Sequence, residues 1–153
     1  MTDEDYMREA LHEAQAASLR GEVPVGAVIV NGQGQIIARA GNAPIAINDP
    51  TAHAEILAMR DAAYMSKNYR LGGLTLYVTL EPCTMCAGAA VNARVERVVF
   101  GAADLEAGAL GSVYNVGVDP RLRHTFEVEH DVLGEACAQA LKSFFSSLRS
   151  SSR

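Results

Sequence analysis

The sequence predicts a single domain of the α/β class, a three-layer α/β/α sandwich around a mixed five-stranded sheet. Stretches of β-branched and apolar residues alternate along the chain with stretches of helical periodicity. The first two predicted strands are separated only by a Gly-rich turn, which pairs strands antiparallel, whereas later strands are separated by predicted helices, which pair them parallel. With 153 residues the chain suits one domain over residues 1–153.

The predicted elements follow one another in a regular order. Apolar residues recur at every third or fourth position over 7–19 and predict an amphipathic helix that ends before Gly21. We expect two later helices to begin at Pro50 and Pro82, because an acidic residue followed by proline is typical of a helix start. The other predicted elements are strands at 25–30, 35–38, 75–80, 97–100 and 125–129 and a closing helix at 132–148. We expect 101–120 to be irregular and the Ser-rich residues 146–153 to fray.

Charge and composition argue against several classes of protein. The chain has 13 Lys and Arg against 18 Asp and Glu, a formal net charge of −5, which disfavours a strong electrostatic binder of nucleic acid. No apolar run approaches the roughly 20 residues that cross a bilayer, so no membrane partner is expected. The N-terminal segment carries acids where a signal or transit peptide carries Lys or Arg, so we expect a cytoplasmic protein. Its three cysteines favour metal binding or redox chemistry over a disulfide scaffold.

Residues of the metal-ligating types gather near the starts of two predicted helices. His53 lies near the first of them, and Cys83 and Cys86 lie near the second. Two cysteines three positions apart share a helix face, and the positive end of the helix dipole favours the thiolates that bind metal. One histidine and two thiolates form a three-ligand Zn²⁺ site whose fourth position is open to water. Cys137 is not a fourth ligand, because it falls on the apolar face of the last predicted helix.

The carboxylate of Glu55 can transfer protons at this zinc site. A carboxylate beside the activated water can accept its proton and deliver it to a ring nitrogen and then to a leaving amine, which is what hydrolytic deamination of a nucleobase requires. Helix geometry raises one difficulty, because residues two apart on a helix point about 200° from each other. His53 and Glu55 can therefore share the water only if it lies beyond the helix end.

The same residues are compatible with other functions. A Cys-X-X-Cys pair at a helix start also fits a thioredoxin-like redox protein or half of a structural zinc knot. Taken alone, His53 is more often a core or surface histidine, and Glu55 is an ordinary helix carboxylate. A redox pair has no use for His-X-Glu at a matching helix start, so the combination favours hydrolytic zinc chemistry. A non-catalytic zinc fold that binds RNA or another partner is the alternative from a different class.

The motifs His53-Ala54-Glu55 and Pro82-Cys83-Thr84-Met85-Cys86 resemble the signature of the cytidine-deaminase-like zinc superfamily. Flanking segments at 42–44, 49–56, 77–89, 98–102 and 108–112 resemble the bacterial tRNA-specific adenosine deaminases, and the resemblance covers about residues 6–148. It implies a cytidine-deaminase-like fold with one Zn²⁺ per subunit. It also implies a homodimer that binds a tRNA anticodon stem-loop and converts the wobble adenosine to inosine.

The resemblance further implies that His53, Cys83 and Cys86 bind the zinc ion. Glu55 would shuttle protons while the activated water attacks C6 of adenine. The backbone N–H groups of Ala54 and Cys83 would help to fix the attacking oxygen, which suits donors at helix starts.

Three other positions match residues that contact substrate in the family. Asn42 would contact the flipped nucleoside, Asp104 would lie near its sugar, and Phe145 would stack on or pack beside an anticodon base. From the residues alone, Asn42 is a turn residue as readily as a ligand-binding one, and Asp104 is a loop carboxylate. Phe144 is in phase with the apolar positions of the last helix and is expected in the core, whereas Glu81 is interpreted as a helix-start residue.

One feature departs from the family pattern. Relatives often end in a Lys- and Arg-rich helix, whereas residues 146–153 contain few bases, so we expect weak phosphate contacts and a specificity that depends on pocket shape and on a splayed single-stranded loop. A deaminase of a free nucleobase or nucleoside, of the guanine or cytosine type, would use the same catalytic residues and is the nearest alternative function.

Overall fold

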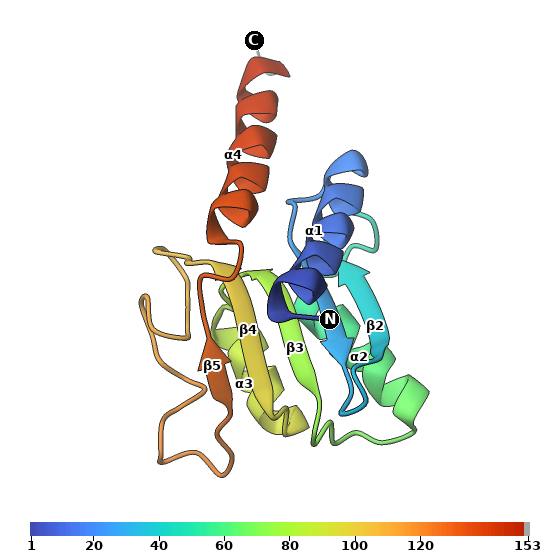
Figure 1. The fold of residues 1–153 in the computed structure, drawn as a ribbon. Coiled ribbons are helices and arrows are strands. Elements are labelled where there is room, and N and C mark those ends of the chain that lie inside the picture. Colours follow the sequence, from blue (N-terminus) through green and yellow to red (C-terminus); the bar gives the residue numbers. More distant parts are fainter. Residues whose placement is uncertain (152–153) are drawn as a thin grey trace.

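A computed structural model describes residues 1–151 and contains one five-stranded sheet between two layers of helices (Figure 1). The strands are β1 (Gly26–Val30), β2 (Ile36–Gly41), β3 (Thr75–Leu80), β4 (Arg97–Ala102) and β5 (Glu127–Glu129). The helices are α1 (Asp3–Leu19), α2 (Ala54–Ser66), α3 (Thr84–Ala93) and α4 (Gly134–Ser151). Helices α1 and α4 cover one face of the sheet, and α2 and α3 cover the other. The predicted α/β/α sandwich is confirmed.

The sheet is mixed, as the connections between its strands predict. Its order is β2-β1-β3-β4-β5. The hairpin strands β1 and β2 pair antiparallel, β1 pairs antiparallel with β3, and β3, β4 and β5 run parallel. The helix α3 forms the crossover from β3 to β4. Strands β3 and β4 therefore end at the same edge of the sheet, and the chain from β3 leads there directly into the Cys-X-X-Cys segment.

The central strands are buried on both faces because each face packs against its own pair of helices. Along β3, Leu76 and Val78 contact the core on the side of α2 and α3, while Tyr77 lies in the core on the side of α1 and α4. Helix α1 lies so close to β1 that a Cβ atom at Gly26 would meet backbone atoms of Ala10 and Ala14. Glycine at this position is therefore required for the close approach of helix and strand.

Helix α4 packs at its start against the end of β4 and then projects beyond the sheet (Figure 1). Cys137 is buried on this helix at the place where a Cβ atom at Gly101 would meet its sulfur, so its predicted place on the apolar face is confirmed. The helix continues to Ser151, and residues 152–153 lie outside the described part of the chain, so fraying of 146–153 stays a prediction. No described helix has the length and hydropathy of a membrane span.

The predicted starts of α2 and α3 are wrong, since α2 begins at Ala54 and α3 at Thr84. The Asp49 carboxylate does not cap a helix at Pro50 but accepts hydrogen bonds from the backbone N–H and the hydroxyl of Thr51, at 2.8 and 2.7 Å. This local turn delays the helix. The two residues before the helices, His53 and Cys83, take the N-cap positions instead.

An ion pair connects the start of α1 to the middle of the sheet. Asp3 accepts two hydrogen bonds from the Arg97 guanidinium of β4, at 2.9 and 2.7 Å, and a third from the Tyr77 hydroxyl of β3, at 2.7 Å. Arg97 holds the pKa of Asp3 below its ordinary value of 3.8. The bidentate pair thus joins the first turn of α1 to two strands.

We expect Asp3→Asn to lower the free energy of unfolding by about 1 kcal/mol at pH 7, because the pair is partly exposed and screened by solvent. Since the folded pKa of Asp3 is lowered, its contribution is complete above the ordinary carboxyl pKa and is lost as the pH falls through the lower, folded value. Urea unfolding curves at pH 7 and pH 3 measure this effect. The control is Glu4→Gln, at an exposed acid of the same helix turn, and an equal loss for Asp3→Asn at both pH values would contradict an electrostatic cause.

Candidate active site and metal centre

Three side chains of ligating types meet where α2 and α3 begin. His53 Nδ1 lies 3.5 Å from Cys86 Sγ and 3.7 Å from Cys83 Sγ, and the three ligand atoms all lie within 4.8 Å of one another. Tetrahedral zinc bonds of about 2.0 Å to nitrogen and 2.3 Å to sulfur place those atoms about 3.5 Å apart. Both the donor set and its spacing therefore fit zinc, and no second cluster of this kind occurs among residues 1–151.

Two of these residues are N-caps, which explains why they converge. His53 has extended backbone angles of φ −73° and ψ 151°, and Cys83 has φ −75° and ψ 177°. Neither side chain caps its own helix, so both remain available to a metal. Cys86 follows in the first turn of α3 and is buried. The positive ends of two helix dipoles thus favour negative charge at this point.

The N-cap position of His53 also resolves the geometric difficulty of sharing one water with Glu55. His53 lies before the first helical residue, whereas Glu55 lies within the first turn of α2, so the helical angle between residues two apart does not apply to them. Glu55 is only 4% exposed, and after this burial its pKa is affected by the nearby Cys86 and His53. The structure thus brings together the four residues that the sequence analysis assigns to metal binding and proton transfer.

The ionisable groups of the site perturb one another strongly. Burial raises the pKa of Glu55. Hydrogen bonds from Cys86 and then His53 lower the pKa of Cys83 to about 3, and the bond to Cys83 raises the pKa of Cys86. Both thiols must lose their protons to act as metal ligands, so the lowered pKa of Cys83 favours metal binding and the raised pKa of Cys86 opposes it.

Asn42 holds the start of α2 from a separate segment. It follows β2, and its Oδ1 atom accepts a hydrogen bond of 2.9 Å from the Ala54 N–H. Because a backbone N–H only donates, this bond assigns Oδ1 to the side facing Ala54 and leaves Nδ2 as the other end of the amide. The bond engages the N–H that we expected to fix the attacking oxygen.

Asp104 lies in the loop that follows β4. Its Oδ1 atom accepts hydrogen bonds of 3.1 Å from the N–H groups of Glu106 and Ala107. Its own N–H donates to Glu81 Oε1 at 3.1 Å. Asp104 is therefore a residue with a defined backbone position beside the end of β3.

The interpretation of Glu81 as a helix-start residue is wrong, because α3 begins at Thr84 and its N-cap is Cys83. Glu81 directly follows β3 and is 2% exposed. Its side chain accepts hydrogen bonds from the loop after β4 instead of from the start of α3. One signal was available in the sequence, because a carboxylate next to a strand predicted to be buried needs several donors.

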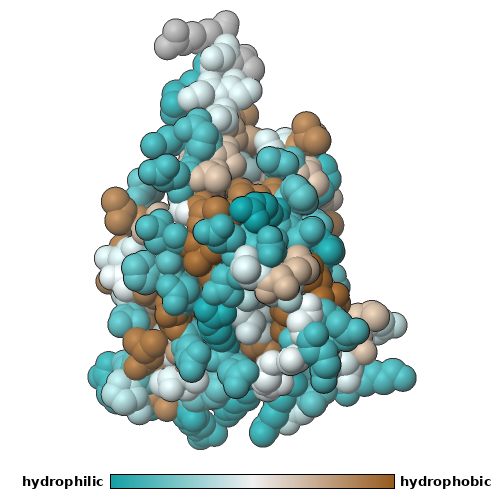
Figure 2. Space-filling model, viewed as in Figure 1, coloured by the Kyte–Doolittle hydropathy of each residue, from teal (hydrophilic) through white to brown (hydrophobic). Residues whose placement is uncertain are grey.

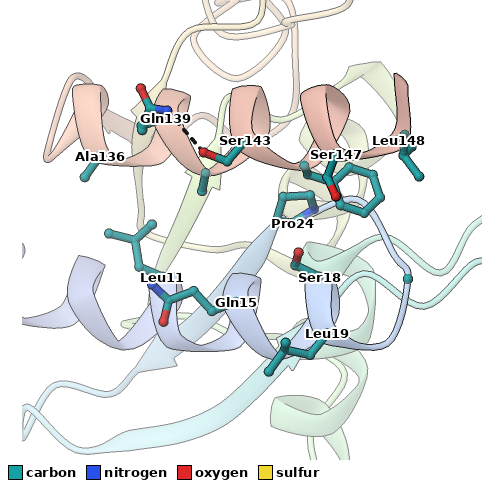
Figure 3. Close-up of a pocket in the computed structure, with 13 residues that line it drawn as sticks. Leu11, Gln15, Ser18, Leu19, Pro24, Ala136, Gln139, Ser143, Ser147 and Leu148 are labelled. Atoms are coloured by element: carbon teal, nitrogen blue, oxygen red, sulfur yellow. Dashed lines mark hydrogen bonds between the residues drawn. The ribbon is translucent and has the colours of Figure 1, made fainter. Parts of the chain in front are cut away.

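The two phenylalanines of α4 lie apart from the metal ligands on their own helix. Phe145 is 42% exposed, and its ring stands edge-on to Phe144 with centroids 5.4 Å apart. The prediction that Phe144 lies in the core is wrong. Phe144 is half-buried and lines a groove of about 770 Å³ between α1 and α4, together with Leu11 and Leu148 (Figure 3). The core prediction fails because α4 extends past the sheet that would have covered this face.

Comparison with known proteins agrees with this geometry. The family described as "Cytidine and deoxycytidylate deaminase zinc-binding region" matches residues 1–102. A tRNA-specific adenosine deaminase of Haemophilus influenzae is 51% identical over 147 residues, which are 96% of this chain and 85% of that protein. The tRNA-specific adenosine deaminase of Bacillus subtilis is 50% identical over 96% of this chain and 91% of its own length.

A solved structure shows the same likeness in three dimensions. It comes from a study of A-to-I editing by tRNA:A34 deaminases at the wobble position, and it superimposes with a TM-score of 0.86 and 44% identity over 90% of this chain and 99% of that chain. Fold, ligand set and sequence identity thus agree. The chain belongs to the cytidine and deoxycytidylate deaminase zinc-binding family and, within it, groups with the tRNA-specific adenosine deaminases.

Proposed function

We propose that this protein hydrolyses adenosine to inosine at the wobble position of a tRNA anticodon, with one zinc ion per subunit. One observation carries the proposal: a His-Cys-Cys ligand set and the buried carboxylate of Glu55 meet at two converging helix starts. The sequence identity of about half to tRNA-specific adenosine deaminases selects the substrate class. A tRNA substrate also favours the cytoplasm as the site of action.

The residues divide the chemistry between them. His53, Cys83 and Cys86 hold the metal, whose role when bound is to make a water molecule acidic enough to supply a nucleophile near neutral pH. Glu55 accepts one proton of the attacking water at its carboxylate and donates it to N1 of the adenine ring. It then accepts the second proton of the same oxygen and gives it to the amino group, which leaves from C6 as ammonia. Burial raises the pKa of Glu55 toward the range in which a carboxyl group can both accept and donate a proton.

Other residues bind the substrate in this proposal. The bond from Ala54 to Asn42 Oδ1 supports a role in which Asn42 Nδ2 donates to an acceptor on the flipped base. The second carboxylate oxygen of Asp104 is suited to a ribose hydroxyl, since Oδ1 already accepts from two N–H groups. The exposed ring of Phe145 is suited to stacking on a base of the anticodon loop.

We expect Cys86→Ser to weaken zinc binding by more than about 100-fold, because it removes a thiolate ligand. The matched control is Cys137→Ala, which removes the buried cysteine of α4 and is expected to retain one zinc ion per chain. Elemental analysis after dialysis against a weak chelator measures the metal, and circular dichroism confirms that each variant is folded. Full zinc content in Cys86→Ser would rule out the assigned ligand set.

We expect the zinc-loaded protein to convert the wobble adenosine of an anticodon stem-loop RNA to inosine, detected by mass spectrometry. Glu55→Gln should bind zinc normally and lose about 10²–10⁴-fold in kcat, because it cannot transfer a proton. The free bases guanine and cytosine and the nucleoside adenosine are tested separately as alternative substrates. Turnover of a free base without inosine in RNA would replace the proposal with a free-base deaminase, and zinc binding without any turnover would favour a non-catalytic zinc fold.

We further propose that the protein is a homodimer. Large apolar side chains are exposed in the chain segments before β3 and after β4, namely Ile45, Ile47, Tyr64, Met65, Tyr69, Leu105 and Tyr114, and an interface with a second copy would remove such side chains from water. We expect sedimentation equilibrium at micromolar concentration to give about twice the chain mass of 16.3 kDa. A mass that stays at one chain would exclude the dimer.

A further inference from the structure

Both carboxylate oxygens of Glu81 accept hydrogen bonds from the loop after β4. Its Oε1 atom accepts from the Asp104 N–H at 3.1 Å and from the Ser112 hydroxyl. Its Oε2 atom accepts from the Leu110 N–H at 2.9 Å and from the Ser112 N–H at 3.1 Å. One buried side chain therefore holds both ends of the loop segment 104–112.

The loop backbone packs directly on this carboxylate. A Cβ atom at Gly108 would meet the Glu81 carboxyl group and the carbonyl oxygen of Asp104. Glycine is needed there for space, so the contact between loop and carboxylate is as close as the backbone allows. The loop is thus formed around the Glu81 side chain.

The anchor lies next to the metal ligands. The Glu81 N–H donates to the Ala102 carbonyl oxygen of β4 at 2.8 Å, which fixes its backbone between the two strand ends. Pro82, which directly precedes the ligand Cys83, accepts a hydrogen bond of 2.8 Å at its carbonyl oxygen from the Ala109 N–H. A shift of the loop therefore changes the wall beside the metal centre and the position of Asp104.

We propose that Glu81 is a positioning residue that holds the loop 104–112 as a wall of the substrate pocket and acts on the substrate through Asp104. The inference rests on the proposed function, in which Asp104 contacts the ribose. Glu81 itself touches neither metal nor substrate. Its contribution is to orient the loop before the RNA binds, which lowers the ordering cost of binding.

Hydrogen-bond chemistry predicts what Glu81→Gln changes. The amide must place its NH₂ group where one of the carboxylate oxygens lies. At the Oε2 position it would face two backbone N–H groups, whereas at Oε1 it faces the Ser112 hydroxyl, which can turn to accept, and the Asp104 N–H, which cannot. Glu81→Gln should therefore release the Asp104 end of the loop and leave most of the anchor intact.

We expect Glu81→Gln to raise KM for the anticodon stem-loop about 10-fold, to change kcat by less than about 3-fold and to retain zinc, because a charge-assisted hydrogen bond is lost outside the metal centre. In an Asp104→Asn background the same substitution should add less than about 2-fold to KM, since both changes act through one contact. Ser112→Ala, which removes one of the four donors, should raise KM about 2-fold and is the second variant if Glu81→Gln fails to fold.

Glu106→Gln is the matched control for charge, because Glu106 is an exposed acid of the same loop. Loss of an acid near RNA lowers KM by electrostatics, which is opposite in direction to the effect expected at Glu81. Hydrogen–deuterium exchange of the peptide covering 103–113 gives a readout without substrate. Exchange there should accelerate in Glu81→Gln and stay unchanged in Glu106→Gln, with α2 and α3 unaffected in both.

The outcomes separate this inference from the proposed function. An unchanged KM, a fall in kcat alone, or full additivity with Asp104→Asn would overturn the positioning role. Unchanged exchange in the 103–113 peptide would overturn the anchor itself. If the unsubstituted protein makes no inosine, the proposed function fails by that result, and the exchange comparison still decides whether Glu81 holds the loop.

Discussion

The site depends on one constraint, which is that α2 and α3 begin close to each other. Helix α3 follows β3 almost directly and α2 packs on the same face of the sheet. The ligands at the two helix starts meet, so the positive ends of both helix dipoles lie close together. The two dipoles favour negative charge there, while burial acts in the opposite direction on Glu55. His53 and Cys83 occupy the N-cap positions, but their side chains make no hydrogen bond to their own helices. The helix starts therefore supply metal ligands as well as the positive ends of two helix dipoles.

Loops that border this point are held by buried carboxylates as well as by apolar packing, since Ala109 and Leu110 belong to the core. Glu22 accepts the N–H groups of Ile45 and Ala46, at 3.2 and 2.8 Å, in the loop that precedes His53. Glu81 holds the loop after β4 in the same way. A buried carboxylate is costly unless its oxygens are bonded, and no buried side-chain nitrogen or oxygen within residues 1–150 lacks a partner.

The surface between α1 and α4 is lined by apolar side chains that no other described element covers. Apolar side chains between α1 and α4 remain visible on the face shown in Figure 2, because α4 leaves the sheet after its first turns. The same departure exposes Phe145 and half-exposes Phe144. Periodicity identified the apolar side of this helix correctly, but a periodic pattern states only which residues share a face and not whether another element covers it.

The sequence by itself determined the order of the elements, the mixed sheet, the ligand set and the presence of Glu55, because residue type and spacing express these features locally. Only the tertiary structure decided where α2 begins, which N–H group bonds Asn42 and which groups donate hydrogen bonds to Glu81. The bond between Asn42 and Ala54 joins residues 12 positions apart, and those of Glu81 join residues 23 to 31 positions apart. No local pattern encodes such pairs, since a carboxylate or amide can bond any donor that the fold brings to it.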